Sequence, residues 1–206
     1  MKIGVCTLNT PEIWDYAQYT CKNVENYCKC HQYDFITRNN SLDKSRHPAW
    51  SKIKLLQKNI QKYDWLMWID ADAIITNYNI KIEDLIDEDY EMIISKEDGD
   101  KKYFNTINSG VFLVKNTNWI INFLAFWYDT QNPNCWCWEQ AVLNNLYCST
   151  DGIKQKIKII PRKSMNSVLS TFIEGDFILH FFRNKKINDL YLNMLKNILL
   201  FTKIIQ

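Results

Sequence analysis

Short apolar runs alternate with longer amphipathic segments along the chain. Apolar runs without polar interruption are typical of strands buried on both faces of a sheet, whereas apolar positions three and four residues apart indicate helices. The alternation predicts an α/β fold, with a mainly parallel central sheet flanked by helices, in a single domain over residues 1–206. The predicted strands lie at 2–8, 33–37, 65–69, 91–95, 111–114, 157–160 and 177–180, and the predicted helices at 14–30, 49–60, 119–128, 138–146 and 189–205.

Two acids, Asp70 and Asp72, follow the most apolar of these strands, WLMWI at 65–69. In open α/β sheets ligands bind outside the carboxyl ends of the strands, so we expect this pair at the mouth of a pocket. Two neighbouring carboxylates repel each other unless a positive charge lies between them, and a divalent cation is the simplest candidate. Carboxylate oxygens suit Mg²⁺ and Mn²⁺, which keep open positions for phosphate oxygens.

A third ligand for such a cation is predicted at His180, which ends the last strand in the sequence GDFILHFFRNKK. The basic residues Arg183, Lys185 and Lys186 follow it and could neutralise a leaving diphosphate. The alternative is a hydrogen-bonded histidine of the core. The acidic pair at the end of another strand favours the metal ligand.

Composition limits the class of protein and its compartment. A formal net charge of +2 argues against a protein that grips nucleic acid through a basic face. Seven cysteines, an odd number, predict reduced thiols in a cytosol-like compartment. The first strand begins directly after Met1 and no apolar segment is long enough to span a bilayer. We therefore expect a soluble protein without a transmembrane segment, cytoplasmic or facing the cytosol, of viral or bacterial type or one domain of a longer chain.

Five sequence blocks occur in an order that indicates a known family. They are AWSKI at 49–53, YDWLMWIDADAII at 63–75, INSGVFLVKN at 107–116, EQ at 139–140 and GDFILHF at 175–181. With these blocks the chain resembles the galactosyl, mannosyl and xylosyl transferases of glycosyltransferase family 34, which have the GT-A fold. The resemblance runs from about Trp50 to Lys185.

The resemblance implies a metal-dependent glycosyltransferase. It would move a sugar from a nucleoside diphosphate, UDP rather than GDP, to a hydroxyl of a protein-linked or lipid-linked glycan, with retention of the anomeric configuration. It implies that Asp70, Asp72 and His180 hold the metal, for which we expect Mn²⁺, with Mg²⁺ as the alternative. The anchor and stem of secretory-pathway relatives are not found in this sequence.

The donor sugar and the diphosphate are also assigned by the resemblance. Asn108, Ser109 and Gly110 would line the sugar pocket, where a glycine lets the backbone approach the ligand. Lys185 lies where relatives place a basic residue on the diphosphate.

The catalytic pair implied by the resemblance is Glu139 with Gln140, which would face the transferred sugar and steady its developing charge. Some relatives carry two consecutive acids where this chain has Trp138 and Glu139, which leaves the role of Glu139 open. Trp136 and Trp138 are expected to contact the acceptor, because aromatic rings stack on sugar faces.

Further contacts to the nucleotide are expected from residues near the ends of the first and third strands. Thr7 and Asn9 lie at the first ligand-facing turn, and Lys52 lies on the helix before the central strand; ordinary surface or capping roles are the alternative for all three. Asp70 would also reach the ribose, and Ala71 lies beside it.

Two other functions remain open from the sequence. The altered pair at Glu139 allows a nucleotide-sugar or glycan-binding module that has lost turnover. A nucleotidyltransferase also uses a metal and an α/β sheet, but the chain lacks a glycine-rich phosphate loop after its first strand.

Overall fold

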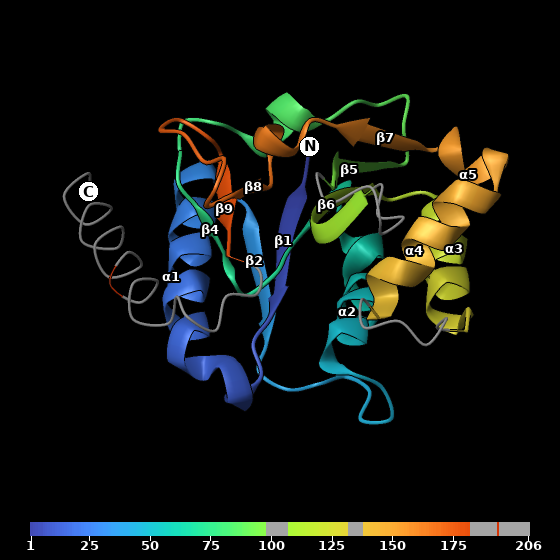
Figure 1. The fold of residues 1–206 in the computed structure, drawn as a ribbon, viewed down its shortest axis with the longest axis horizontal. Helices are drawn as coiled ribbons and strands as arrows, with labels where there is room; N and C mark the ends of the chain where they lie inside the picture. The colour runs from blue at the N-terminus through green and yellow to red at the C-terminus, as the bar shows by residue number, and fades with distance from the viewer. Residues whose placement is uncertain (98–106, 132–137, 182–192, 194–206) are drawn as a thin grey trace.

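A computed structural model describes residues 1–97, 107–131, 138–181 and 193 (Figure 1). Within these residues the main sheet has six strands, in the spatial order β2 (Asp34–Arg38), β1 (Ile3–Leu8), β3 (Trp65–Ile69), β6 (Ile107–Lys115), β5 (Met92–Lys96) and β7 (Ile157–Ile160). Strand β6 runs antiparallel to both of its neighbours, and the other neighbouring pairs are parallel. The predicted α/β fold with a mainly parallel sheet is therefore confirmed.

Strand β3 is buried on both faces because helices cover both sides of the sheet. Successive side chains of a strand point to opposite faces. Trp65, Met67 and Ile69 pack in one core cluster with α1 (Trp14–His31), while Leu66 and Trp68 pack in another with α2 (Ser51–Asn59) and α3 (Asn118–Asp129). Figure 1 shows α1 on one side of the sheet and α2, α3 and α4 (Trp138–Ser149) on the other.

A small second sheet brings the end of the described chain to the central strand. It consists of β4 (Ala73–Ile75), β9 (Ile178–His180) and β8 (Ser167–Val168). Ala73 pairs with His180 across the antiparallel β4 and β9. Helix α1 holds β4 in place, because the buried Asn23 amide donates to the carbonyl of Ile75 at 3.0 Å and accepts from its N–H at 2.7 Å. His180 consequently lies beside the acidic turn although it is far away in sequence.

Most predicted elements agree with the structure to within a few residues, and the largest difference is at β6. This strand begins at Ile107 rather than at Val111, because the polar residues Asn108 and Ser109 are buried and hydrogen-bonded inside it. The predicted helix at 189–205 lies outside the described residues. The sequence pattern did not reveal the short elements β4, α5 (Asp151–Lys154) and β8, or the 3₁₀ helices Pro11–Ile13, Pro48–Trp50, Ile60–Lys62, Ile82–Leu85 and Arg162–Ser164.

Candidate active site

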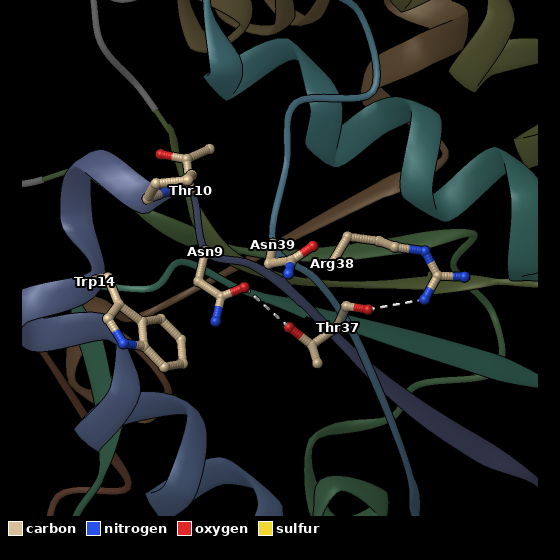
Figure 2. Close-up of a pocket in the computed structure, with 7 residues that line it drawn as sticks. Asn9, Thr10, Trp14, Thr37, Arg38 and Asn39 are labelled. Carbon is tan, nitrogen blue, oxygen red and sulfur yellow. Dashed lines mark hydrogen bonds between the residues drawn. The ribbon is translucent and has the colours of Figure 1, made fainter.

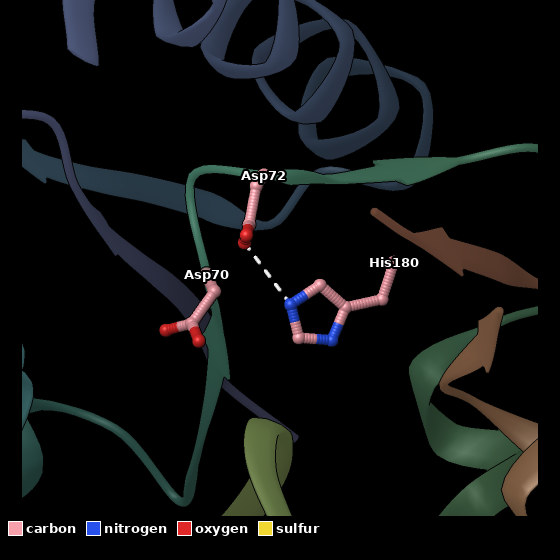
Figure 3. A group of neighbouring side chains, drawn as sticks. All are labelled: Asp70, Asp72 and His180. Atoms are coloured by element: carbon pink, nitrogen blue, oxygen red, sulfur yellow. Dashed lines mark hydrogen bonds and ion pairs between the residues drawn. The ribbon is translucent and has the colours of Figure 1, made fainter. Parts of the chain in front are cut away.

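Asp70, Asp72 and His180 come together at the carboxyl end of β3 (Figure 3). One ligand atom from each of the three lies within 4.8 Å of the others. His180 Nε2 lies 3.0 Å from Asp72 Oδ1. Two carboxylates and one imidazole, converging from two separate sheets, are a donor set that suits Mn²⁺ or Mg²⁺. The residues present therefore fit a divalent metal.

Hydrogen bonds to the backbone fix the turn that carries these acids. The Thr20 hydroxyl of α1 donates to the carbonyl of Ala71 at 2.6 Å, and the N–H of Phe181 donates to the carbonyl of Asp72 at 2.9 Å. Ala71 is buried and offers the site its backbone alone. The turn is thus held from α1 on one side and from the end of β9 on the other, which sets the direction of both carboxylates.

Asp72 and His180 stabilise each other's charged forms. Burial alone would raise the pKa of Asp72, but the His180 imidazolium lowers it below its usual value. Burial alone would lower the pKa of His180, but the Asp72 carboxylate raises it above its usual value. A metal ion binds the neutral imidazole, so His180 would hold a divalent cation through Nε2 after losing the proton from that atom.

Gly110 gives the His180 ring its space. A Cβ atom at this position would lie 2.2 Å from Cε1 and 2.7 Å from Nδ1 of His180. Carbon atoms do not approach this closely, so a side chain here would force the imidazole away from Asp72. Gly110 therefore leaves room for the ring of the candidate metal ligand His180. Its place in the sugar pocket, which the resemblance implies, stays a prediction.

Replacing Gly110 with alanine is expected to lower stability by about 1–3 kcal/mol, because the added methyl group overpacks a buried contact. We expect Mn²⁺ to raise the melting temperature of the wild type and not that of Gly110→Ala. Gly152→Ala is the matched control, since a Cβ there meets nothing within 4 Å. Differential scanning fluorimetry of both variants with and without Mn²⁺ checks this, and a Gly110→Ala protein that Mn²⁺ stabilises like the wild type contradicts it.

A buried lysine joins the acidic turn to the beginning of α4. Lys52 Nζ lies 3.1 Å from Asp70 Oδ1 and 2.7 Å from Glu139 Oε1, and it donates to the carbonyl of Ser109 at 3.0 Å. The Lys52 side chain is only 3% exposed. Burial alone would lower its pKa, but the carboxylates of Asp70 and Glu139 raise it above the usual value. Lys52 is therefore a fixed positive charge between two acids.

Ser109 holds the predicted catalytic pair from the side of the sheet. Its hydroxyl donates to Glu139 Oε1 at 3.0 Å, and its backbone N–H donates to Gln140 Oε1 at 2.9 Å. The second oxygen of Glu139, Oε2, is buried and has no hydrogen-bond partner among the described residues. Burial raises the pKa of Glu139, and Lys52 offsets part of that rise. Glu139 Oε2 can therefore accept a hydrogen bond from a ligand.

Asn108 bonds inward, toward a group of residues that the sequence analysis did not identify. Its side chain contacts Glu97 and Asn166, which lie close to Ser95 and Arg162. No local motif marks these residues, since each is a single polar residue at the end of a strand or in a short turn. The placement of Asn108 in the sugar pocket stays a prediction.

A cavity of about 610 Å³ lies at the carboxyl ends of β1 and β2 (Figure 2). Figure 2 shows Trp14, from the start of α1, on one side of Asn9, and Thr37 and Arg38, from the end of β2, on the other. Asn9 is a predicted nucleotide contact, whereas the sequence does not single out Trp14 and Arg38, whose signal is only their position after predicted strands. The remaining lining residues are Thr10, Pro11 and Asn39.

Four predicted site residues remain, namely Thr7, Trp136, Trp138 and Lys185. Thr7 is buried inside β1 and does not line the cavity. Trp138 stacks on His47 with 3.7 Å between ring centroids, at the beginning of α4. Trp136 and Lys185 lie outside the described residues. None of the helices in the part of the chain that the structure describes has both the length and the apolar character to cross a membrane.

Residues 24–142 match the model of one protein family, which is more than half of the chain. The chain belongs to the family described as "Protein of unknown function, DUF273". This DUF273 chain is also similar to galactomannan galactosyltransferase 1 of Cyamopsis tetragonoloba, with 23% identity over 163 residues. The match covers 75% of the chain but only 35% of the plant protein. The chain therefore spans about a third of the length of this relative.

Solved structures of glycosyltransferases share the fold of this DUF273 protein. A glycosyltransferase involved in the glycosylation of the major capsid of PBCV-1 superimposes with a TM-score of 0.79 and 19% identity, covering 96% of this chain and 100% of the other. A mutant Drosophila β1,4-galactosyltransferase 7, solved with manganese, UDP-Gal and xylobiose, gives 0.54 and 11%, covering 90% and 72%. The GT-A fold and the resemblance to galactosyl transferases are thereby confirmed.

Proposed function

We propose that this protein is a metal-dependent glycosyltransferase that moves a sugar from a nucleoside diphosphate, UDP rather than GDP, to a hydroxyl of a glycan. The observation that carries the proposal is the cluster of Asp70, Asp72 and His180 beside the buried Glu139, at the ligand-binding edge of a GT-A fold. The Drosophila enzyme of the same fold was solved with manganese and UDP-Gal, which supports the choice of metal and base.

The nucleoside, the diphosphate and the sugar of a donor would each contact different residues along this edge of the sheet. The cavity beside Asn9 and Trp14 offers an aromatic ring and amide groups to a nucleoside. The metal cluster comes next along the sheet, since β3 pairs directly with β1, and it suits the diphosphate. Next come Ser109 on β6 and Glu139 on α4, where a sugar would lie.

Different residues of the chain would take different roles in the transfer of the sugar. A bound metal would supply Lewis-acid stabilisation to the diphosphate as its charge develops. Lys52 keeps Asp70 and Glu139 at fixed positions and compensates their charge. The unpartnered oxygen of Glu139 accepts a hydrogen bond from a sugar hydroxyl and stabilises positive charge on the sugar ring. Retention of configuration belongs to the proposal, and NMR of the product's anomeric proton checks it.

The acceptor side of the proposal rests on Trp138, whose ring stacks on His47 next to Glu139. An aromatic surface beside the proposed sugar position suits a glycan acceptor. Trp136 is proposed for the same surface.

A donor panel tests the proposed function. UDP-sugars and GDP-sugars are incubated with the protein and Mn²⁺, and the melting temperature and release of free sugar are measured. We expect stabilisation by UDP-sugars that requires Mn²⁺, together with slow sugar release. Binding without sugar release or transfer to any glycan would instead support the module that has lost turnover. Binding of neither nucleotide would contradict both functions.

Glu139→Gln is expected to lower kcat by about 10²-fold while the affinity for UDP stays close to that of the wild type, because the lost charge acts on the sugar rather than on the nucleotide. Rates of sugar release and UDP titrations measure the two quantities. Glu174→Gln, at an exposed acid, is the control and should retain full activity. An unchanged kcat in Glu139→Gln would remove Glu139 from the proposed chemistry.

A further inference from the structure

We infer that Asn166, a fully buried residue between β7 and β8, positions His180 for metal binding by selecting which nitrogen of the imidazole faces Asp72. The inference rests on the metal role given to His180 in the proposed function. Asn166 Oδ1 lies 2.9 Å from Nδ1 of His180. The other imidazole nitrogen, Nε2, is the one that lies beside the carboxylate of Asp72.

The direction of each hydrogen bond in this region is fixed by the backbone of Gly110. Its N–H can only donate, and it donates to Asn108 Oδ1 at 2.8 Å. This places the amide nitrogen of Asn108 toward Glu97 Oε2, at 2.6 Å. The oxygen of Asn108 also contacts Asn166, at 2.8 Å, so the contacting atom of Asn166 must be its NH₂ group.

The tautomer of His180 follows from that orientation. Since the NH₂ group of Asn166 faces Asn108 and Ser95, its amide oxygen faces His180. An amide oxygen only accepts, so Nδ1 of His180 must carry the hydrogen. The neutral imidazole then has its lone pair on Nε2, which is the form that a metal requires at this atom.

An ion pair between Arg162 and Glu97 holds the end of this hydrogen-bond network that lies farthest from His180. Arg162 Nη1 lies 2.7 Å from Glu97 Oε1, and both side chains are less than a tenth exposed. Glu97 follows β5, Asn108 lies on β6, and Asn166 lies between β7 and β8, so separate parts of the fold hold the network. Burying this many polar groups costs free energy that apolar side chains would not, and the hydrogen bonds between them orient the members of the network. The member that reaches the metal cluster is His180.

The test compares two substitutions of Asn166. Asn166→Leu keeps the branching and the number of heavy atoms, with bulkier methyl groups, but removes the acceptor for Nδ1–H. Asn166→Asp keeps an acceptor oxygen while losing the NH₂ group. We expect Asn166→Leu to weaken Mn²⁺ binding by about 10–100-fold, as loss of such an orienting partner does. Asn166→Asp should bind Mn²⁺ close to wild type although its network is also broken. Free Mn²⁺ is counted by electron paramagnetic resonance, and the coupling of Mn²⁺ to an imidazole nitrogen is read from electron spin echo modulation.

Two further variants distinguish the orientation of His180 from a general loss of stability and from a failure of the metal site itself. Asn59→Leu removes a buried asparagine of α2 that lies outside the cluster and should lower the melting temperature without changing Mn²⁺ affinity. Equal Mn²⁺ binding in the wild type and Asn166→Leu, or equal losses in the two Asn166 variants, overturns the positioning role. Asp72→Ala tests the metal role itself. If Asp72→Ala binds Mn²⁺ like the wild type, the proposed metal site fails and not the orientation of His180 alone.

Discussion

Replacing Asp72 with alanine is expected to abolish the part of UDP binding that depends on Mn²⁺. The variant loses one of three converging ligands and also the charge that faces His180. Loss of a residue that only orients a ligand costs about 10–100-fold in metal affinity, so loss of the ligand itself should cost at least about 100-fold. Isothermal titration of UDP with and without Mn²⁺ measures the effect, and a chelator added to the wild type should reproduce it.

Two controls make the Asp72→Ala result specific. Asp72→Asn keeps the shape of the side chain and a partner for His180 but removes the negative charge, so it should fold normally and still bind the metal weakly. Asp89→Ala removes an exposed acid elsewhere and should bind as the wild type does. Tight UDP binding in Asp72→Ala that responds to Mn²⁺ as in the wild type would contradict the metal role.

Replacing Lys52 with methionine is expected to lower the free energy of unfolding by about 3–5 kcal/mol, which is the usual cost of removing one partner from a buried ion pair. The loss arises because Glu139 and Asp70 then face each other without the ammonium between them. Urea unfolding at neutral pH measures the change. Lys58→Met is the control on the same helix, and as an exposed position it should change stability by less than about 0.5 kcal/mol.

A double substitution identifies the cause of the loss. In Lys52→Met with Glu139→Gln the uncompensated charge of Glu139 is removed, so this protein should lose less stability than the two single variants added together. Strict additivity would show that Lys52 contributes through packing and not through its charge.

The hydrophobic pattern predicted the parts of the fold in which local preference and burial agree. Strand β3 was predicted with the observed bounds, Trp65–Ile69, because both of its faces are buried and no polar residue interrupts it. The ends of β7 were likewise predicted correctly. The start of β6 was missed, since Asn108 and Ser109 resemble a loop in sequence and are accommodated in a strand only by partners from distant segments.

The acidic pair at the end of β3 and, through the resemblance, a set of candidate residues could be predicted from the sequence. How these residues meet depends on the folded chain. His180 reaches Asp72 because β9 pairs with β4, and Lys52 reaches Glu139 because α2 and α4 cover the same face of the sheet. Asn166, Glu97 and Arg162 had no signal in the sequence, because a polar residue receives its role from the donors and acceptors that the folded chain brings within about 3 Å of it.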